Sequence, residues 1–302
     1  MSILDVENII KSYTEKKVLK EVSFSIKEGE IVALIGPNGS GKTTIMKIIS
    51  GLLNQDAGTV KICGLSLQCN RIEYLSKFSS IIETPSLYEM LSGYDNINFI
   101  RKINNISITK MDEILKFINI GKSINDKVKN YSLGMKQRLA LGMSLITEPK
   151  LLILDEPTNG LDPEGVIEFR GLLKKFASEN GMSILISSHI LSELDKISTR
   201  ILFIKDGELV DMEGFNESQE SQTIILTVKN QEEIFILIQE IEFVDKVNIS
   251  ENNKINIQVN KNNTSKLISR LIEKNIQYTN IEIENINIEK IYKDIYLGGK
   301  DE

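Results

Sequence analysis

The sequence predicts an α/β fold followed by a small α+β domain. Short apolar runs at 31–36, 151–157 and 183–189 have the composition of strands that are buried on both faces of a sheet. Stretches with helical spacing separate these runs, and such alternation favours a sheet of mostly parallel strands. After a polar stretch at 214–222 the pattern restarts as β-α-β-β-α-β, which is typical of a small separate domain.

The bulk composition fits two domains and narrows the range of partners. The chain has 302 residues and a hydrophobic content of 41%, which is enough to bury a full core. A net charge of −6 argues against a broad nucleic-acid surface, so we expect no nucleic-acid partner. Two cysteines and one histidine argue against a structural zinc site. No apolar run reaches the ~20 residues of a membrane span, so we expect any membrane role to come through a partner.

The elements of the first domain follow in order along the chain. Apolar and polar residues alternate at 22–26 as in a half-buried strand, and a turn leads to the buried run at 31–36. A glycine-rich loop then precedes a helical pattern at 43–53. A polar, helix-rich stretch at about 85–145 predicts a helical subdomain, and an amphipathic helix is expected at 164–180.

The composition places the domain boundary after the last of these elements. We expect a first domain over 1–213, a polar linker at 214–222 and a second domain over 223–302. The second domain is expected to contain strands at 223–228, 243–249, 254–259 and 278–285, with helices at 231–241, 264–275 and 288–297. This order resembles a ferredoxin-like unit.

The glycine-rich loop predicts a phosphate-binding site. Gly36–Thr43 matches GxxxxGK[ST] in the context that the motif requires, after a strand and at the start of a helix. Backbone N–H groups of such a loop face phosphate oxygens, and the helix N-terminus adds its positive end. We expect Lys42 to reach the β- and γ-phosphates and the Thr43 hydroxyl to bind Mg²⁺. The ATP-binding residues expected here are Asn38, Gly39, Ser40, Gly41, Lys42, Thr43 and Thr44. A glycine turn without a ligand is the alternative.

An acid pair at the tip of a later strand completes the predicted site. The run LLILDEP places Asp155 and Glu156 at the C-terminal end of a buried strand. We expect Asp155 to hold the Mg²⁺ shell and Glu156 to polarise the attacking water as general base. Adjacent carboxylates also occur in plain turns, but the preceding phosphate loop favours the catalytic interpretation.

The stretch YSLGMKQRLALG, at 131–142, predicts a second anion-binding helix start. A serine and a glycine-containing backbone precede a helix with basic residues. This stretch resembles the signature of ATP-binding cassette (ABC) ATPases, with SLGMKQR in place of the usual LSGGQ. An ordinary helix capped by Ser132 is the alternative. The order of the motifs favours the signature, and the resemblance covers roughly residues 3–213.

The resemblance implies a site that is shared between two copies of the chain. In this family two nucleotide-binding domains hold two ATP molecules between them. The signature residues of one copy would then contact the nucleotide of the other copy. The residues at these positions are Ser132, Gly134 and Gln137, and Asp162 in NGLDP matches the D-loop at the same interface.

Three further positions agree with this interpretation. Tyr13, upstream of the phosphate loop, is expected to stack on adenine with Val18 packing beside it. A lone exposed tyrosine in a strand is the alternative for Tyr13. His189 is the only histidine and ends the run SILISSH, where we expect a hydrogen bond to the γ-phosphate as part of the catalytic set.

Glu83 occupies a position where most ABC ATPases have a glutamine. In most ABC ATPases the carbonyl oxygen of this glutamine can reach Mg²⁺, so the resemblance implies that Glu83 contacts the metal. A glutamate keeps the acceptor oxygen and adds a negative charge there. The stretch ETPSLYEMLSGYDNI, which begins at Glu83, resembles the subgroup of lantibiotic-immunity and bacitracin-resistance ATPases. A solvent-facing Glu83 without a role is the alternative.

The sequence therefore predicts an ATP-hydrolysing subunit of a bacterial ABC transporter with ATP and Mg²⁺ as cofactors. The resemblance implies a transmembrane permease and a second copy of the chain as partners, with the chain at the cytoplasmic face of the membrane. Its subgroup implies removal of an antimicrobial peptide. An exporter ATPase for an ion, lipid or drug, and an ABC ATPase without a transport role, stay open at this point.

Overall fold

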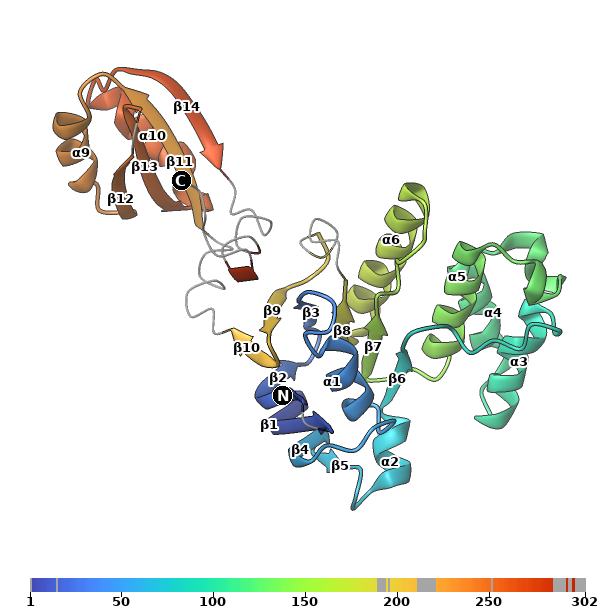
Figure 1. Cartoon of the computed structure of the whole chain (residues 1–302). Helices are drawn as coiled ribbons and strands as arrows, with labels where there is room; N and C mark the ends of the chain where they lie inside the picture. Colours follow the sequence, from blue (N-terminus) through green and yellow to red (C-terminus); the bar gives the residue numbers. More distant parts are fainter. Residues whose placement is uncertain are drawn as a thin grey trace. The chain divides into compact units, whose positions relative to one another are not determined.

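The chain divides into two compact units in the computed structural model. The structure describes residues 2–14, 16–188, 194, 196–210, 221–250, 252–284, 292 and 295–296. The units comprise Met1–Val210 and Asp211–Glu302, and each is considered by itself (Figure 1).

A six-stranded sheet forms the centre of the first unit. Its strands lie in the order β10-β9-β3-β8-β7-β6, and all neighbours are parallel except β10, which is antiparallel to β9. The strands are β3 (Ile31–Ile35), β6 (Phe78–Ile81), β7 (Leu151–Asp155), β8 (Ser183–Ser187), β9 (Arg200–Lys205) and β10 (Glu208–Val210). Every residue of β3, β7 and β8 is buried, which explains their unbroken apolar sequences.

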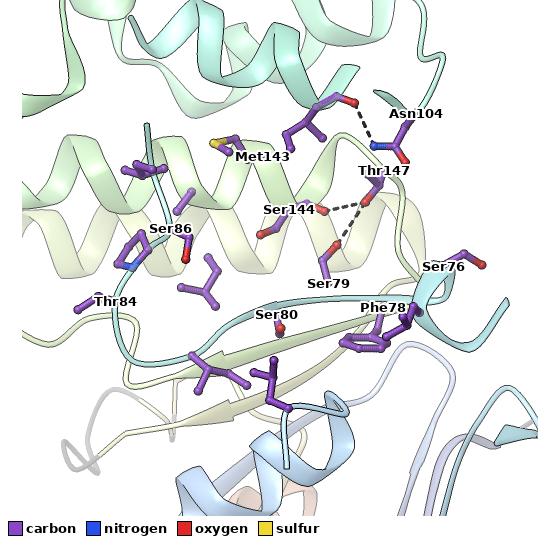
Figure 2. Close-up of a pocket in the computed structure, with 18 of the residues that line it drawn as sticks. Ser76, Phe78, Ser79, Ser80, Thr84, Ser86, Asn104, Met143, Ser144 and Thr147 are labelled. Carbon is purple, nitrogen blue, oxygen red and sulfur yellow. Dashed lines mark hydrogen bonds between the residues drawn. The ribbon is translucent and has the colours of Figure 1, made fainter. Parts of the chain in front are cut away.

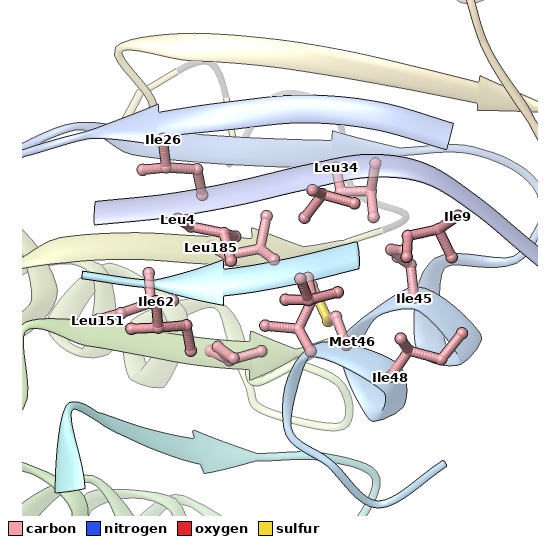
Figure 3. Packing of buried hydrophobic residues seen from close by; sticks show 14 of the residues in the cluster. Leu4, Ile9, Ile26, Leu34, Ile45, Met46, Ile48, Ile62, Leu151 and Leu185 are labelled. Carbon is pink, nitrogen blue, oxygen red and sulfur yellow. The ribbon is translucent and has the colours of Figure 1, made fainter. Parts of the chain in front are cut away.

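A four-stranded antiparallel sheet packs beside the central sheet. Its order is β2-β1-β4-β5, formed by β1 (Ser2–Tyr13), β2 (Lys16–Lys27), β4 (Ala57–Ile62) and β5 (Leu65–Ser66). Figure 3 shows the shared core, in which Leu4 and Ile62 of this sheet face Met46 of helix α1 (Lys42–Ile49) and Leu185 of β8. The core therefore fixes α1, and with it the loop that precedes α1, against both sheets.

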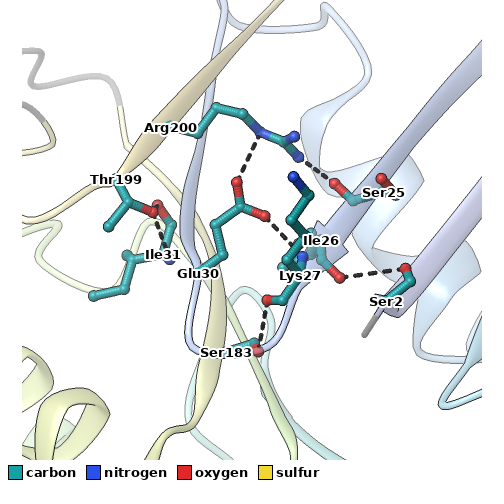
Figure 4. A network of polar contacts seen from close by, with 9 residues as sticks. All are labelled: Ser2, Ser25, Ile26, Lys27, Glu30, Ile31, Ser183, Thr199 and Arg200. Carbon is teal, nitrogen blue, oxygen red and sulfur yellow. Dashed lines mark hydrogen bonds and ion pairs between the residues drawn. The ribbon is translucent and has the colours of Figure 1, made fainter. Parts of the chain in front are cut away.

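Polar contacts join the two sheets at one end (Figure 4). The Arg200 guanidinium on β9 donates to the carbonyl oxygen of Ser25 on β2, and its Nε lies 3.3 Å from Oε1 of Glu30. Ser183 Oγ on β8 donates to the carbonyl oxygen of Lys27 at 3.1 Å. These contacts fix the end of the central sheet against the antiparallel sheet.

The helices of the first unit form a helical arm between β6 and β7, together with helices beside the sheets. The arm contains α3 (Gly93–Ile103), α4 (Ile108–Ile118) and α5 (Leu133–Leu145), with short 3₁₀ turns η1 (Gly121–Asn125) and η2 (Val128–Asn130). Ser92, Ser107 and Ser132 cap the three helices with their side-chain oxygens. Helix α2 (Arg71–Ser76) precedes β6, and α6 (Pro163–Asn180) connects β7 to β8.

The second unit is a four-stranded antiparallel sheet with two helices. The sheet order is β12-β13-β11-β14, and the chain order is β-α-β-β-α-β as the sequence predicts. The elements are β11 (Ser221–Val228), α9 (Gln231–Gln239), β12 (Val244–Ser250), β13 (Lys254–Asn260), η3 (Lys261–Asn263), α10 (Thr264–Glu273) and β14 (Tyr278–Glu284). Alternate residues of β11 and β13, such as Ile224 and Ile257, join Leu267 of α10 in a separate core.

Some expected features differ from the structure or lie outside the described residues. The long strand over 2–13 has no counterpart in the sequence-based assignment, because its alternation is irregular and β-bulges interrupt its pairing. The expected linker at 214–222 falls mostly outside the described residues, and its last two residues begin β11. The closing helix expected at 288–297 lies outside the described residues except for three positions.

Candidate nucleotide-binding site

The phosphate-binding loop is packed so tightly that two of its positions require glycine. Gly41 has φ 112°, and a Cβ there would lie 2.6 Å from Cδ2 of Leu19 and 3.3 Å from the carbonyl oxygen of Val18. A Cβ on Gly36 would lie 2.5 Å from the carbonyl oxygen of Ile204 on β9. The loop between β3 and α1 is therefore held by the two strands beside it.

The side chain of Lys42 lies inside this loop. It is 5% exposed, and its Nζ donates to the carbonyl oxygens of Gly36 at 2.8 Å and Pro37 at 3.2 Å. Burial lowers the pKa of the Lys42 ammonium, and the nearby carboxylates of Glu156 and Asp155 oppose that shift. A buried cation held by carbonyl dipoles is suited to bind an anion at the same place.

Ser40 supplies an independent sign that the loop is built for a ligand. Its side chain is 5% exposed, and its Oγ has no hydrogen-bond partner among the described residues. Buried hydroxyls are normally bonded, so an orphaned hydroxyl next to Lys42 fits a loop whose partner is a phosphate oxygen. Asn38 and Gly39 are exposed at the mouth of the loop, and Thr44 is half-buried on α1.

The acid pair at the tip of β7 meets the end of the loop. Thr43 Oγ1 donates to Asp155 Oδ2 at 2.6 Å, and Ser187 Oγ on β8 donates to Asp155 Oδ1 at 2.6 Å. Because hydroxyl and carboxylate oxygens are the ligands that Mg²⁺ prefers, Thr43 and Asp155 fit the predicted metal site. Ser187 is not among the site residues predicted from the sequence, although a serine at the tip of the buried strand 183–187 is a signal that points to it.

Glu156 follows β7 in an unusual backbone conformation. Its φ is 47°, in the left-handed region that few side chains adopt, and its N–H donates to Ser187 Oγ at 2.9 Å. Its Oε1 lies 4.0 Å from Lys42 Nζ. The turn thus brings the Glu156 carboxylate to the charged end of Lys42, where a terminal phosphate would lie.

Glu83 is not positioned with the other acids. Its Oε1 lies 2.6 Å from Nζ of Lys47 on α1, an ion pair that the sequence does not predict. The hydrogen bond with Glu83 is the main cause that raises the pKa of Lys47. Within the described part of the chain no three His, Cys, Asp or Glu side chains gather as a metal site, so Glu83 does not join Asp155 and Glu156. The metal contact of Glu83 stays a prediction.

Tyr13 lies at the exposed end of β1. Its side chain is 47% exposed, and the Lys11 ammonium lies 5.8 Å from the ring centroid. Val18 is half-buried on β2, with its carbonyl oxygen against Gly41 of the phosphate loop. An exposed aromatic face near that loop can stack on a flat ring.

The signature and D-loop residues line one cavity of about 360 Å³. Ser132 caps α5 by accepting from the N–H of Met135 at 3.3 Å, and Asp162 caps α6 by accepting from the N–H of Gly165 at 3.1 Å. Gly134 lies in the same cavity. Figure 1 shows α5 in the helical arm, apart from α1, so this group and the phosphate loop form separate sites within one chain.

Two other predicted site residues have different outcomes. Gln137 is 5% exposed, and its Oε1 has no partner among the described residues. The contact of Gln137 with a nucleotide on another copy stays a prediction. His189 lies outside the described residues.

A cavity of about 710 Å³ opens between β6 and the helical arm (Figure 2). Its walls come from Ser79 and Ser80 of β6, Thr84 and Ser86 of the following loop, and Met143 of α5. Ser79 Oγ and Thr147 Oγ1 are 3.2 Å apart at one end. We call this cavity the arm groove. The loop that forms one wall begins near Glu83, and the Lys47–Glu83 ion pair joins it to α1, the helix that follows the phosphate loop.

Family models match the part of the chain that contains these motifs. A model described as "ABC transporter" matches residues 19–159. A second model, described as "AAA domain, putative AbiEii toxin, Type IV TA system", matches residues 127–195.

Curated relatives include proteins of the same size. The "Uncharacterized ABC transporter ATP-binding protein YhcH" of Bacillus subtilis is 34% identical over 100% of this chain and 98% of its own length. The "Bacitracin transport ATP-binding protein BcrA" of Bacillus licheniformis is 30% identical over 99% of this chain and 98% of its own length. The "Lantibiotic transport ATP-binding protein SrtF" of Streptococcus pyogenes is 44% identical over 72% of this chain and 93% of its own length.

Solved structures share the architecture of the first unit. A dimeric bacterial ABC transporter cassette has a TM-score of 0.63 and 27% identity, and covers 69% of this chain and 97% of its own. The same cassette as a post-hydrolysis dimer bound to ADP and Pi has a TM-score of 0.62 at the same identity and coverage.

Proposed function

Since this chain belongs to the family of ABC transporter ATP-binding proteins, we propose that it powers a separate membrane permease that exports or removes an antimicrobial peptide of the lantibiotic or bacitracin type. The chain is an ATPase of this family. Among the described residues no helix is both long and apolar enough to cross a bilayer. In this proposal the permease holds the chain at the cytoplasmic face of the membrane.

The arm groove supports the proposal of a permease partner. It is open, and Leu52 and Leu75 at its edge are exposed by 67% and 39%. Other exposed apolar side chains of the arm and the loop before it include Tyr88, Met90, Leu91, Tyr94, Phe99 and Ile103. Exposed apolar patches of this kind mark interaction surfaces. A short helix at the cytoplasmic side of the permease would fit the groove and bury these side chains.

The arrangement of the phosphate loop supports ATP as substrate. Lys42 and Ser40 would bind the terminal phosphates, and Tyr13 and Val18 would hold the adenine. Mg²⁺ held by Thr43 and Asp155 would neutralise phosphate charge. Glu156 would accept a proton from the attacking water, since its turn places the carboxylate beside Lys42.

A second copy would complete the site. Ser132, Gly134 and Asp162 line a cavity of their own within one chain, beside the N-termini of two helices. Such helix starts favour a phosphate group, and a facing copy can supply one. Closure of two copies around ATP would also move the two arms, and with them the permease.

The cargo proposal rests on the comparisons. The relative named for bacitracin transport matches this chain through both units, and the relative named for lantibiotic transport has the higher identity over a shorter stretch. The stretch from Glu83 to Ile97 resembles the same subgroup in sequence.

The proposal can be tested in a sensitive bacterial host that expresses the chain together with the permease encoded beside it. The minimal inhibitory concentrations of nisin and bacitracin are measured with the wild-type chain, with Glu156→Gln and with an empty vector. The proposal predicts protection against at least one peptide by the wild-type chain alone. Equal sensitivity of all three strains to both peptides would refute the peptide cargo.

A further inference from the structure

Lys47 and Glu83 form a contact that lies between the phosphate loop and the arm groove. Lys47 follows Thr43 by one helical turn on α1, so the two side chains lie on the same face of the helix. Its Nζ lies 2.6 Å from Oε1 of Glu83. The ion pair therefore holds Glu83 beside the face of α1 that carries Thr43, whose hydroxyl donates to Asp155 of β7.

The backbone at Glu83 shows that this position is constrained. Its φ is 63°, in the left-handed region where a glutamate is uncommon. Glu83 follows β6 by two residues, and Thr84 and Ser86 after it line the arm groove. A movement of Glu83 would therefore act on one wall of that groove.

The ion pair is open to competition. The Lys47 side chain is 32% exposed and that of Glu83 is 62% exposed. Exposed ion pairs contribute little to stability, because water screens them. A divalent cation bound at Thr43 and Asp155 would attract the same carboxylate more strongly than one ammonium does.

We propose that Lys47 is a positioning residue that competes with Mg²⁺ for the carboxylate of Glu83. Without metal and nucleotide, Lys47 holds Glu83 beside the site. When Mg²⁺ and ATP bind, the Lys47–Glu83 ion pair gives way to a contact between Glu83 and the metal, and the groove wall shifts with it. This inference rests on the proposed function, since it takes the phosphate loop to bind ATP with Mg²⁺.

A double-mutant cycle tests the competition. Lys47→Met and Glu83→Gln are made singly and together in full-length Glu156→Gln protein, in which hydrolysis is slowed. The Mg²⁺ dependence of fluorescent ATP-analogue binding gives the metal affinity of each variant. Lys47→Met should raise that affinity roughly two- to fivefold where Glu83 is kept, the range that one exposed ion pair supplies. It should change the affinity little in the background that carries Glu83→Gln.

Two controls separate the ion pair from a general charge effect. Lys274→Met removes the partner of Glu240 in the second unit, where exposed fractions of 31% and 63% match those of Lys47 and Glu83. It should leave the metal affinity unchanged. Lys47→Arg keeps the ion pair, so its Mg²⁺ affinity should stay near that of the parent protein.

The outcomes are distinct. Equal effects of Lys47→Met with and without Glu83→Gln would overturn the inference, and so would a loss of metal affinity where Glu83 is kept. If Lys47→Met does not fold, as judged by circular dichroism, Lys47→Gln replaces it. If no variant binds the analogue in a Mg²⁺-dependent manner, the proposed ATP site itself fails.

Discussion

The Thr43 hydroxyl donates a 2.6 Å hydrogen bond to Oδ2 of Asp155, which joins the end of the phosphate loop to the tip of β7. Ser187 on the neighbouring strand β8 holds the second carboxylate oxygen at 2.6 Å. The two hydrogen bonds thus fix the orientation of the Asp155 carboxylate beside Thr43. A metal site at this place needs little reorganisation when the nucleotide arrives.

Asp155→Asn should weaken Mg²⁺-dependent ATP binding about ten- to a hundredfold. The physical reason is that a charged oxygen ligand is replaced by a neutral amide, a loss of ~1.5–3 kcal/mol. Binding of ATP in EDTA should change much less. Ser187→Ala keeps the charge and should have an intermediate effect on the Mg²⁺-dependent affinity. Isothermal titration calorimetry with and without Mg²⁺ measures the ATP affinity of both variants. If Asp155→Asn lost the same affinity in the two conditions, a metal role of Asp155 would be contradicted.

Gly41→Ala should abolish nucleotide binding and lower the free energy of unfolding by about 1–3 kcal/mol. The new Cβ would lie 2.6 Å from Leu19 Cδ2 at a backbone φ of 112°. Gly39→Ala is the matched control, because Gly39 also has a positive φ but no atom within 4 Å of its Cβ position. Gly39→Ala should lower the free energy of unfolding only by the strain of an alanine at positive φ. Urea unfolding gives both free energies, and identical values for the two variants would show that the packing around Gly41 is unimportant.

Glu89→Gln should remove a stabilisation that depends on pH. Glu89 Oε1 lies 2.7 Å from Lys136 Nζ on α5, and this hydrogen bond is the main cause that lowers the pKa of Glu89 in the folded chain. The folded pKa is below the unfolded one, so the ion pair stabilises the fold above the unfolded pKa. That contribution is lost as the pH falls through the folded pKa. Wild-type and variant urea midpoints should therefore differ at pH 7, and the difference should disappear as the pH falls below the ordinary pKa of glutamate, about 4.3, and through the lowered folded pKa. A difference that persists at the acid end would contradict this account.

Gly171→Ala should stabilise the chain by roughly 0.5–1 kcal/mol, because glycine loses more backbone entropy than alanine in a helix. Gly171 lies within α6, is exposed, and would place its Cβ in open space. The melting temperature should rise while ATP hydrolysis stays the same. A lower melting temperature would mean that the glycine serves a contact that one chain alone does not show.

The sequence predicts the local parts of this protein better than the long-range contacts. The phosphate loop, the acid pair and the serine that caps α5 each lie within a short stretch, and their backbone requirements are visible in residue types. The fold class is confirmed, since the structure has the parallel sheet and the small antiparallel domain. The irregular strand over 2–13 is not predicted from the sequence, because bulges disturb its alternation of apolar and polar residues.

Contacts between distant segments needed the structure. Lys47 and Glu83 are 36 residues apart, and Lys136 and Glu89 are 47 apart, so no periodicity links them. The expected metal contact of Glu83 came from the resemblance alone. Only the structure shows that the Glu83 carboxylate forms an ion pair with a lysine of α1. It also shows that the backbone of Glu83 has a left-handed conformation.

We propose that ATP hydrolysis by this chain needs the signature residues of a second copy. Ser132→Asp tests it, since aspartate also caps helices and preserves α5, while its charge repels a phosphate. Ser107→Asp, at the equivalent cap of α4, is the matched control. The direct measurement is ATPase activity per chain over a range of protein concentrations. The activity of the wild-type chain and of Ser107→Asp should rise with concentration. The activity of Ser132→Asp should be lower by roughly a hundredfold, with ATP binding retained. Full activity of Ser132→Asp, independent of concentration, would contradict it.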